Sequence, residues 1–408
     1  MSQRRRNTIR EITLPTVCAL LFILYLLIER FSIGRKLRRI PLRICVAGTR
    51  GKSSVTRFIA SCLREKGLCV LAKTTGSRPT LILPDGSEEE LKRRGLPSIL
   101  EQKSLLQHAI RLGADVLVCE VMSIRPESGC AETIQIVQPK IIAFTNIRLD
   151  HMAQMGSSKE KMAEVFASWI PDGSTVFIPE KECFPVFLKV SRASKSALIR
   201  VSEEAFGKIS ALAKEFPFFE WRENISLALA VAEHLGVERN RALQGMARSN
   251  PDFGSLKIWK VDWSAPPCSL ECVSCFSANE PESTGEALSF LEERKFFDGK
   301  TVLGLLNLRK DRGDRTLQWL RAVRDGAAFP VFRKIFLAGL HARAFRRKLR
   351  GTKRDDVVVL KSRSPEGIMS QILKEEEGRC VVVGMGNIGG TGRDLVSYWE
   401  RVGKACDV

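Results

Sequence analysis

Short apolar runs alternate with amphipathic stretches along most of this chain. The runs of strand length predict buried strands at Arg43–Ala47, Cys69–Ala72, Asp115–Glu120, Lys140–Asn146 and Ser174–Ile178. The stretches with helical periodicity predict helices at Lys52–Lys66, Leu100–Leu112, Lys159–Ile170 and Glu223–Leu235. Strands and helices that alternate in this way are typical of an α/β domain built on a mostly parallel sheet.

A second series of the same kind follows Pro251–Gly254, whose Pro and Gly residues predict a linker. Its predicted strands are Ile258–Val261, Thr301–Leu306, Lys334–Leu337 and Cys380–Val383. We therefore expect a central α/β domain over residues 41–250 and a smaller, Rossmann-like α/β domain over residues 256–408.

The amino-terminal segment has a different pattern. Residues 12–31 are largely apolar, and a spanning helix needs about 20 such residues. Arginines flank the segment on both sides, and the heavier basic flank follows it. By the positive-inside rule, residues 1–40 are expected to form a single uncleaved anchor in the cell membrane, with the catalytic domains in the cytoplasm. The alternative is a buried helix of a soluble domain.

Composition narrows the class of protein. The 408 residues are 44% hydrophobic and 27% charged, which excludes a mostly disordered chain or a polytopic membrane protein. A net charge of +19 favours a polyanionic neighbour. Nucleic acid is not expected, because 2 Tyr and an aromatic content of 7% leave few stacking platforms. Cys268, Cys272 and Cys275 raise the question of zinc, but no fourth ligand completes the set.

The segment between the first predicted strand and helix has the pattern of a phosphate-binding loop. Glycines let backbone N–H groups turn toward phosphate oxygens, and the start of a helix adds positive potential. The loop lysine reaches the β- and γ-phosphates, and the next hydroxyl binds Mg²⁺. Val46 stands where the longer loop pattern has Gly, and a plain turn is the alternative. The residues expected to bind nucleotide are Gly48, Thr49, Arg50, Gly51, Lys52, Ser53 and Ser54.

Polar residues also follow neighbouring strands. Glu120 ends one strand, Thr75 follows another, and Asp150 and His151 follow a third. The carboxyl ends of parallel strands form the ligand-binding edge of an open sheet. A carboxylate there suits Mg²⁺. A polar turn explains Thr75 nearly as well, and His151 could equally be structural.

In this order, the pieces resemble the Mur ligase superfamily of ATP-dependent, amide-forming enzymes. A closer resemblance, from the anchor to the end of the chain, is to the ligase subunits of poly-γ-glutamate synthases (the CapB/PgsB type). The matching segments are GTRGKSSVTR (48–57), KTTG (73–76), EQK (101–103), Glu120-x-Met122, Asp150–Gly156, Asp311–Thr316 and Gly384–Gly390.

The resemblance implies a Mur-ligase-like central domain that uses ATP and Mg²⁺ to activate a carboxylate as an acyl phosphate. It implies roles in catalysis for Lys52, His151 and Arg312. It implies nucleotide contacts for Asn224, Asp311 and Arg315, and metal ligation by Ser53, Thr75, Glu120 and His151. The implied partners are glutamate, an anionic polyglutamate chain, the inner membrane, a multi-span membrane subunit and a subunit on the exported face.

Two departures and two alternatives accompany the resemblance. Many Mur ligases carry a carbamylated lysine near the position of Phe166, so no modified lysine is expected here. Lys257 stands where an arginine is usual, so a bidentate contact would be lost. The first alternative is a membrane-anchored P-loop kinase or NTPase, and the second is a nucleotide-binding scaffold of a membrane complex.

Overall fold

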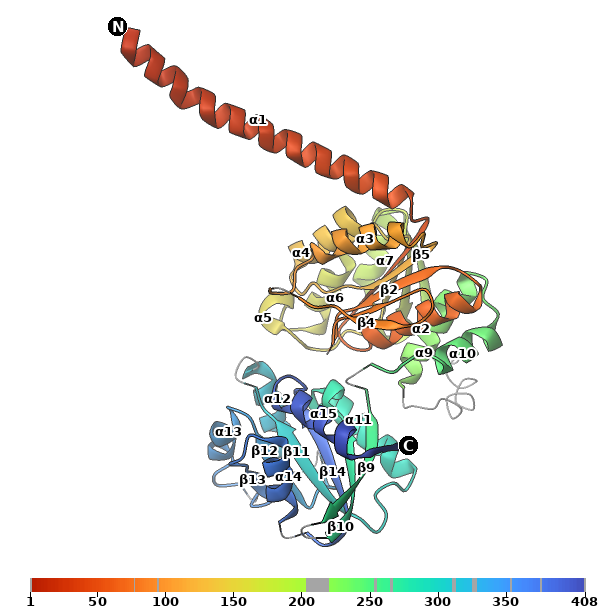
Figure 1. Ribbon diagram of the computed structural model, residues 1–408, viewed down its shortest axis with the longest axis vertical. Coiled ribbons are helices and arrows are strands. Elements are labelled where there is room, and N and C mark those ends of the chain that lie inside the picture. The colour runs from red at the N-terminus through yellow and green to blue at the C-terminus, as the bar shows by residue number, and fades with distance from the viewer. Residues whose placement is uncertain are drawn as a thin grey trace.

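An amino-terminal helix and two α/β units make up the molecule (Figure 1). The computed structural model describes residues 2–76, 78–93, 95–202, 220–252, 255–264, 267–309, 313–324, 329–352, 354–374 and 376–406. The central unit lies between the helix and the second unit, so the second unit is the part farthest from the amino terminus.

The helix α1 (Ser2–Arg38) contains a stretch long and apolar enough to cross a membrane. This stretch, Pro15–Arg38, has a window of mean hydropathy 2.0 that is 0% buried, unlike the buried helix of the alternative interpretation. Its end is tied to the central unit, because Leu37 and Ile40 are buried in that unit's core. The Arg43 guanidinium donates to the carbonyl oxygen of Leu37 at 3.0 Å and of Val137 at 2.9 Å.

The central sheet is mostly parallel, and within the described residues its antiparallel pairs are β2–β3 and β3–β4. In the described residues its order is β4 (Glu88–Glu90), β3 (Thr80–Ile82), β2 (Val70–Thr74), β5 (Val116–Glu120), β1 (Leu42–Ala47), β6 (Ile141–Phe144), β7 (Thr175–Pro179) and β8 (Ala197–Val201).

Helices cover both faces of this sheet. Successive residues of a strand point to opposite faces, and in the central strands both sets of residues are apolar. Ile44 and Val46 of β1 pack toward one core, and Cys45 and Ala47 pack toward the other. The first core is covered by α2 (Lys52–Glu65), α9 (Arg222–His234) and α10 (Arg239–Ala247). The second is covered by α3 (Glu101–Arg111), the π-helix Ala131–Val137, α6 (Lys159–Ala167) and α7 (Pro185–Ala193). The short helices α4 (Pro126–Cys130) and α5 (Met152–Met155) and the 3₁₀ turn Glu180–Glu182 also belong to this unit.

The second unit is smaller, and its sheet also has helices on both faces. Its sheet has the order β13 (Val357–Val359), β12 (Lys334–Ala338), β11 (Thr301–Asn307), β14 (Gly378–Gly386), β10 (Pro267–Ser274), β9 (Lys257–Ser264) and β15 (Lys404–Cys406). One face is covered by α11 (Pro281–Glu293), α12 (Gly313–Arg324) and α13 (Ala342–Lys348). The other is covered by α14 (Pro365–Leu373) and α15 (Thr391–Val402), and a 3₁₀ turn spans Phe276–Ala278.

The predicted fold class is confirmed, with small shifts at the ends of elements. The predicted strand Lys140–Asn146 is shorter in the structure, where β6 ends at Phe144. The sequence interpretation missed β10 because polar residues interrupt its apolar pattern. One of them, Glu271, is buried and pairs with Lys300. The domain boundaries stay predictions, and part of the predicted linker, residues 253–254, lies outside the described residues.

Candidate active site

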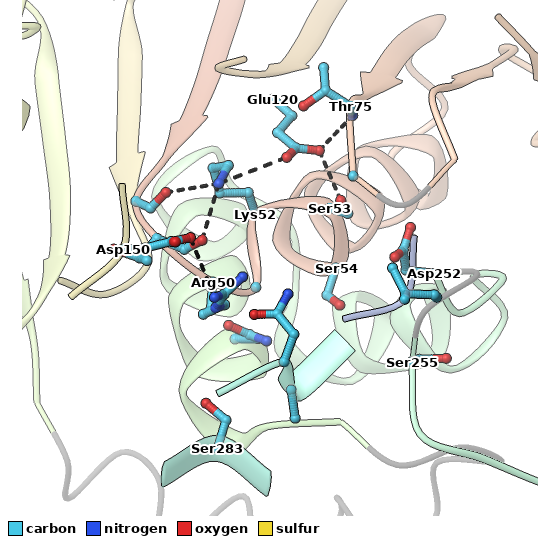
Figure 2. Close-up of a pocket in the computed structure, with 18 of the residues that line it drawn as sticks. Arg50, Lys52, Ser53, Ser54, Thr75, Glu120, Asp150, Asp252, Ser255 and Ser283 are labelled. Atoms are coloured by element: carbon cyan, nitrogen blue, oxygen red, sulfur yellow. Dashed lines mark hydrogen bonds and ion pairs between the residues drawn. The ribbon is translucent and has the colours of Figure 1, made fainter. Parts of the chain in front are cut away.

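A cavity of about 430 Å³ lies between the two α/β units and is lined by both. On the central side, the carboxyl ends of β1, β2, β5 and β6 meet there, as expected for ligand sites in open α/β sheets. Figure 2 shows the side chains of the phosphate loop, of the strand ends and of the second unit pointing toward the same space.

The phosphate loop joins β1 to α2 in the conformation that its glycines allow. Gly51 immediately precedes α2 with a φ of 77°, in the left-handed region that favours glycine. A Cβ atom on Gly51 would lie 2.2 Å from Asn224 Oδ1, so glycine also makes room for α9. The Asn146 amide accepts a bond from Arg50 N at 3.0 Å and donates to Arg50 O at 3.2 Å. The loop is therefore fixed from two neighbouring elements.

Lys52 lies over the loop rather than out in solvent. Its ammonium donates to Gly48 O at 2.9 Å and to Thr49 O at 3.2 Å. It also lies 4.0 Å from Glu120 Oε1. Burial lowers the pKa of Lys52, and the nearby Glu120 carboxylate acts in the opposite direction.

Glu120 gathers polar groups from two other segments (Figure 2). Its Oε2 accepts a hydrogen bond from Ser53 Oγ at 2.8 Å and another from Thr75 N at 2.7 Å. Glu120 is only 3% exposed, so it does not point into solvent from the end of its strand. Behind it, the fully buried Glu132 accepts from the amides of Met122 and Ser123 and holds the segment that follows β5.

Asp150 connects the loop after β6 to both walls of the cavity. Its carboxylate lies 3.3 Å from Arg50 Nη2 and accepts two bonds from Arg315 Nη2, at 3.0 and 2.8 Å. His151 Nε2 lies 3.8 Å from Asp150 Oδ2. His151 has a φ of 48° and immediately precedes α5, so the backbone there is strained in a way uncommon for residues other than glycine.

Arginines and an asparagine form much of the second unit's wall. Arg315 Nη1 donates to Asn387 Oδ1 at 3.1 Å. Arg309 lies across the glycine-rich turn, where a Cβ atom on Gly389 would be 2.0 Å from Arg309 Nη1. Arg393 also lines the cavity. Glycine at position 389 therefore allows a cation to approach the cavity.

A further ion-pair group joins the two units beside the cavity. Arg148 lies 3.3 Å from Glu280 Oε1 and 3.2 Å from Glu286 Oε2, and it bonds to Ser283 Oγ. These contacts connect the loop after β6 to the start of α11. The two units are thus held together by Arg148 on one side and by Arg315 on the other.

Asn224 and Glu220 lie at the other end of the phosphate loop. Asn224 Nδ2 donates to Glu220 Oε1 at 2.7 Å, and Asn224 is 3% exposed. Burial raises the pKa of Glu220, and hydrogen bonds from Ser54 and Asn224 oppose that rise. The polar side chains of Glu220 and Asn224 therefore pack against the phosphate loop at the start of α9.

Most of the predicted site residues come together at this cavity. Those that line it are Gly48, Thr49, Arg50, Gly51, Lys52, Ser53, Ser54, Thr75, Glu120, His151, Asn224 and Arg315. Asp311 and Arg312 lie outside the described residues. The sequence interpretation missed Arg148, Glu220, Arg309, Asn387 and Arg393. Asn387 had a signal in the sequence, because it lies in Gly384–Gly390, one of the segments that match the family.

The structure also bears on one predicted departure and on the question of zinc. Phe166, near which the resemblance places a modified lysine in many Mur ligases, lines the cavity with its side chain nearly buried. In the part of the chain that the structure describes, no group of three or more His, Cys, Asp or Glu side chains could hold a metal ion. Cys268 and Cys272 lie on β10 and Cys275 follows it, and all three are buried.

Two family comparisons divide the chain as the two sheets do. The Mur ligase middle domain family matches residues 46–234. The poly-gamma-glutamate synthase CapB C-terminal domain family matches residues 267–402.

Among solved structures, FolC of E. coli in complex with ADP has a TM-score of 0.61 at 17% identity, covering 91% of this chain and 94% of that one. The folylpolyglutamate synthase/dihydrofolate synthase of Yersinia pestis complexed with AMPPNP and Mn ion has a TM-score of 0.65 at 16% identity, covering 91% and 93%. These structures share the fold.

Two proteins similar in sequence extend the match over both units. Capsule biosynthesis protein CapB of Bacillus anthracis is 31% identical over 329 residues, which cover 79% of this chain and 69% of that protein. PGA synthase CapB of Bacillus subtilis is 28% identical over 384 residues, which cover 93% and 95%. The chain therefore belongs to the CapB family of Mur-ligase-like, ATP-dependent ligases.

Proposed function

We propose that this protein uses ATP to join glutamate to a growing poly-γ-glutamate chain. The observation that carries the proposal is a single cavity with two different walls. The phosphate loop and Glu120 form one wall, and Arg309 and Arg315 contribute to the other. Loop amides and a lysine suit phosphate, whereas guanidinium groups suit carboxylates. The names of the two relatives, a PGA synthase and a capsule biosynthesis protein, favour the same substrate.

The chemistry requires activation, because a carboxylate has no good leaving group at neutral pH. In the first step, a γ-carboxylate oxygen attacks the γ-phosphorus of ATP, the bond to the bridging oxygen breaks, and ADP leaves. In the second step, an amine nitrogen attacks the acyl carbon, and the bond between that carbon and the phosphate oxygen breaks. Phosphate departs with that electron pair, and the amine gives up a proton. Lys52 and the loop amides are suited to stabilise the negative charge of the transferring phosphoryl group.

The first wall also fits Mg²⁺. A hydroxyl and a carboxylate converge there, with Ser53 Oγ 2.8 Å from Glu120 Oε2. A single carboxylate suits an ion that takes its remaining ligands from phosphate and water. We assign Ser53, Thr75, Glu120 and His151 to hold it, and when bound it would neutralise charge on the phosphate oxygens.

The second unit is proposed to close the site. Arg315 already bridges to Asp150. Asp311 and Arg312 come shortly before Arg315 in the chain, and we assign Arg312 to the transferring phosphate and Asp311 to the nucleotide. Asn224 is assigned to the nucleotide from the central unit. Closure of this kind excludes water, which would otherwise hydrolyse an acyl phosphate.

The membrane part of the proposal rests on α1. The end of α1 and the residue after it are basic, with Arg30, Arg35, Lys36, Arg38 and Arg39, and such a basic flank favours the cytoplasmic side. The anchor would keep both α/β units at the inner face of the membrane. There they could deliver an anionic polymer to a multi-span subunit and to a subunit on the exported face.

The test is ATP turnover by the full-length protein in its membrane complex. Glutamate should stimulate ADP release, and hydroxylamine should trap the activated carboxylate as a hydroxamate. A kinase or NTPase would release ADP without glutamate and yield no hydroxamate. A nucleotide-binding scaffold would bind ATP without turnover. Either result contradicts the proposal.

A matched pair of variants connects this activity to the site. Lys52→Ala should abolish polymer synthesis and leave membrane attachment intact. Lys189→Ala removes an exposed lysine of α7 and should behave like the natural protein. Normal polymer yield from Lys52→Ala would show that the phosphate loop does not carry the reaction.

A further inference from the structure

The second unit has a strongly basic surface that the proposed reaction does not use. Residues 341–354 contain no Asp or Glu. Their exposed basic residues on and after α13 are Arg343, Arg347, Lys348 and Arg350, which we call the basic tract. Arg343, Arg347 and Arg350 are spaced by four and then three residues, so they project from one side of the helix and its extension.

The charge of the basic tract is not neutralised by neighbours. Within the described ranges, no carboxylate forms an ion pair with any of its four residues. The flanking cations differ, since Arg354 pairs with Asp356 at 2.8 Å and Arg346 lies 3.8 Å from Asp355. The tract therefore presents unpaired positive charge to solvent, which attracts a polyanion.

The tract begins close to the catalytic cavity. His341, immediately before α13, has its Nδ1 3.1 Å from Thr316 Oγ1 on α12. Thr316 follows Arg315, whose side chain lines the cavity. Figure 1 shows α13 beside α12 on the outer flank of the second unit, far from α1. A chain that left the cavity past α12 would meet α13 next.

The location and the composition of the basic tract favour one kind of polyanionic ligand over others. Anionic lipid does not suit the tract, because the central unit lies between it and the membrane helix. Nucleic acid binding to single strands commonly uses exposed aromatic rings, and the aromatic ring of α13, Phe345, is 1% exposed. A γ-linked polyglutamate leaves one α-carboxylate free on every residue, so it offers regularly repeated charge without bases.

We propose that the basic tract holds the growing poly-γ-glutamate chain outside the cavity, so that several residues are added before the polymer is released. The inference rests on the proposed function. Exposed charge pairs are individually weak and are screened by salt. Such a tract would retain a long polymer through many contacts while letting it slide after each addition.

The experiment compares two triple variants of the full-length protein in nanodiscs of zwitterionic lipid. The tract variant carries Arg343→Gln, Arg347→Gln and Arg350→Gln. The control carries Lys140→Gln, Lys189→Gln and Arg192→Gln, which remove the same charge from exposed positions of the central unit. Binding of labelled poly-γ-glutamate oligomers at low salt should weaken about tenfold in the tract variant. It should stay near the natural value in the control.

Product length is the second measurement. In the assembled synthase, the tract variant should make shorter polymer while glutamate-dependent ADP release with a short acceptor stays within about twofold of the natural rate. Equal polymer affinity in the two variants, unchanged product length, or tighter binding of single-stranded RNA than of polyglutamate would overturn the inference. The binding measurement does not require turnover. Absence of glutamate-dependent ADP release in the natural protein would therefore count separately, against the proposed function.

Discussion

Arg315 of the second unit donates to both carboxylate oxygens of Asp150 in the central unit, at 3.0 and 2.8 Å. Both side chains are nearly buried, with exposed fractions of 6% and 7%. Asp150 also lies 3.3 Å from Arg50 in the phosphate loop, and Arg315 also donates to Asn387 in the glycine-rich turn. One ion pair thus joins the nucleotide side of the cavity to the opposite wall.

We expect Arg315→Ala to lower kcat by about 100-fold, because small displacements between reacting groups have effects of that size. Arg315→Lys should recover part of the activity, since it keeps the charge but not the planar guanidinium. Steady-state ADP release with saturating glutamate measures both variants. Arg321→Ala, at an exposed position of the same helix, is the control and should match the natural protein. A natural kcat in Arg315→Ala would separate this pair from catalysis.

Much of the central domain and of its candidate site could be predicted from the sequence, because each follows a simple general rule. Apolar alternation located the parallel strands, and the rule that ligands bind at the carboxyl ends of strands brought Thr75, Glu120 and His151 to one edge. The structure has all three lining one cavity.

Relationships across the cavity were not accessible in this way. The contact of Arg148 with Glu280 depends on how two units pack, and no local pattern encodes it. Glu220 was missed because its raised pKa arises from burial by other segments. The turn at Gly384–Gly390 matches the family in sequence, but its sequence does not predict that Asn387 contacts Arg315.

Removing the charge of Glu120 should change the metal dependence of the enzyme. Glu120→Gln keeps the shape and one oxygen that can accept from Thr75 N, so the fold should be retained. Because Glu120 is proposed to bind Mg²⁺, the loss of its carboxylate should raise the Mg²⁺ concentration needed for half-maximal ADP release by about tenfold or more. A Mg²⁺ titration measures this. An unchanged titration curve, with normal ATP affinity, would remove Glu120 from the metal site.

The buried Glu132 predicts a pH dependence of stability. Burial raises its pKa above the ordinary value of 4.5, although hydrogen bonds from Ser123 and Gln102 act in the opposite direction. The folded protein therefore binds this proton more tightly than the unfolded chain does. The resulting stabilisation is complete below pH 4.5 and is lost as the pH rises through the folded-state pKa.

Glu132→Gln should therefore make the stability of the protein depend less on pH. The natural protein should lose thermal stability relative to the variant as the pH is raised from 4.5 toward neutrality. Melting temperatures measured in parallel over this range give the difference directly, and titrations of other groups cancel. A parallel pair of curves would show that Glu132 has the same proton affinity in the folded and unfolded states.

Gly51 in the phosphate loop and Gly67 after α2 have similar φ angles, so a comparison of the two distinguishes backbone strain from a steric clash. Gly51 has a φ of 77° and faces Asn224, whereas Gly67 has a φ of 83° and no heavy atom within 4 Å of the point that a Cβ atom would occupy. An alanine at either position adopts a disfavoured left-handed conformation, which costs about 1–2 kcal/mol. Both Gly51→Ala and Gly67→Ala should therefore lower the melting temperature.

Only Gly51→Ala should also impair nucleotide binding. Its Cβ atom would meet Asn224 Oδ1 at 2.2 Å, so the loop or α9 must move away from the position that aims the loop amides at phosphate. We expect the Kd for a non-hydrolysable ATP analogue to rise by more than about tenfold in Gly51→Ala, equivalent to about 1.4 kcal/mol. Gly67→Ala should bind the analogue normally. Calorimetric titration of the two variants decides the matter, because equal affinities would mean that the close contact between the loop and α9 has no part in holding the nucleotide.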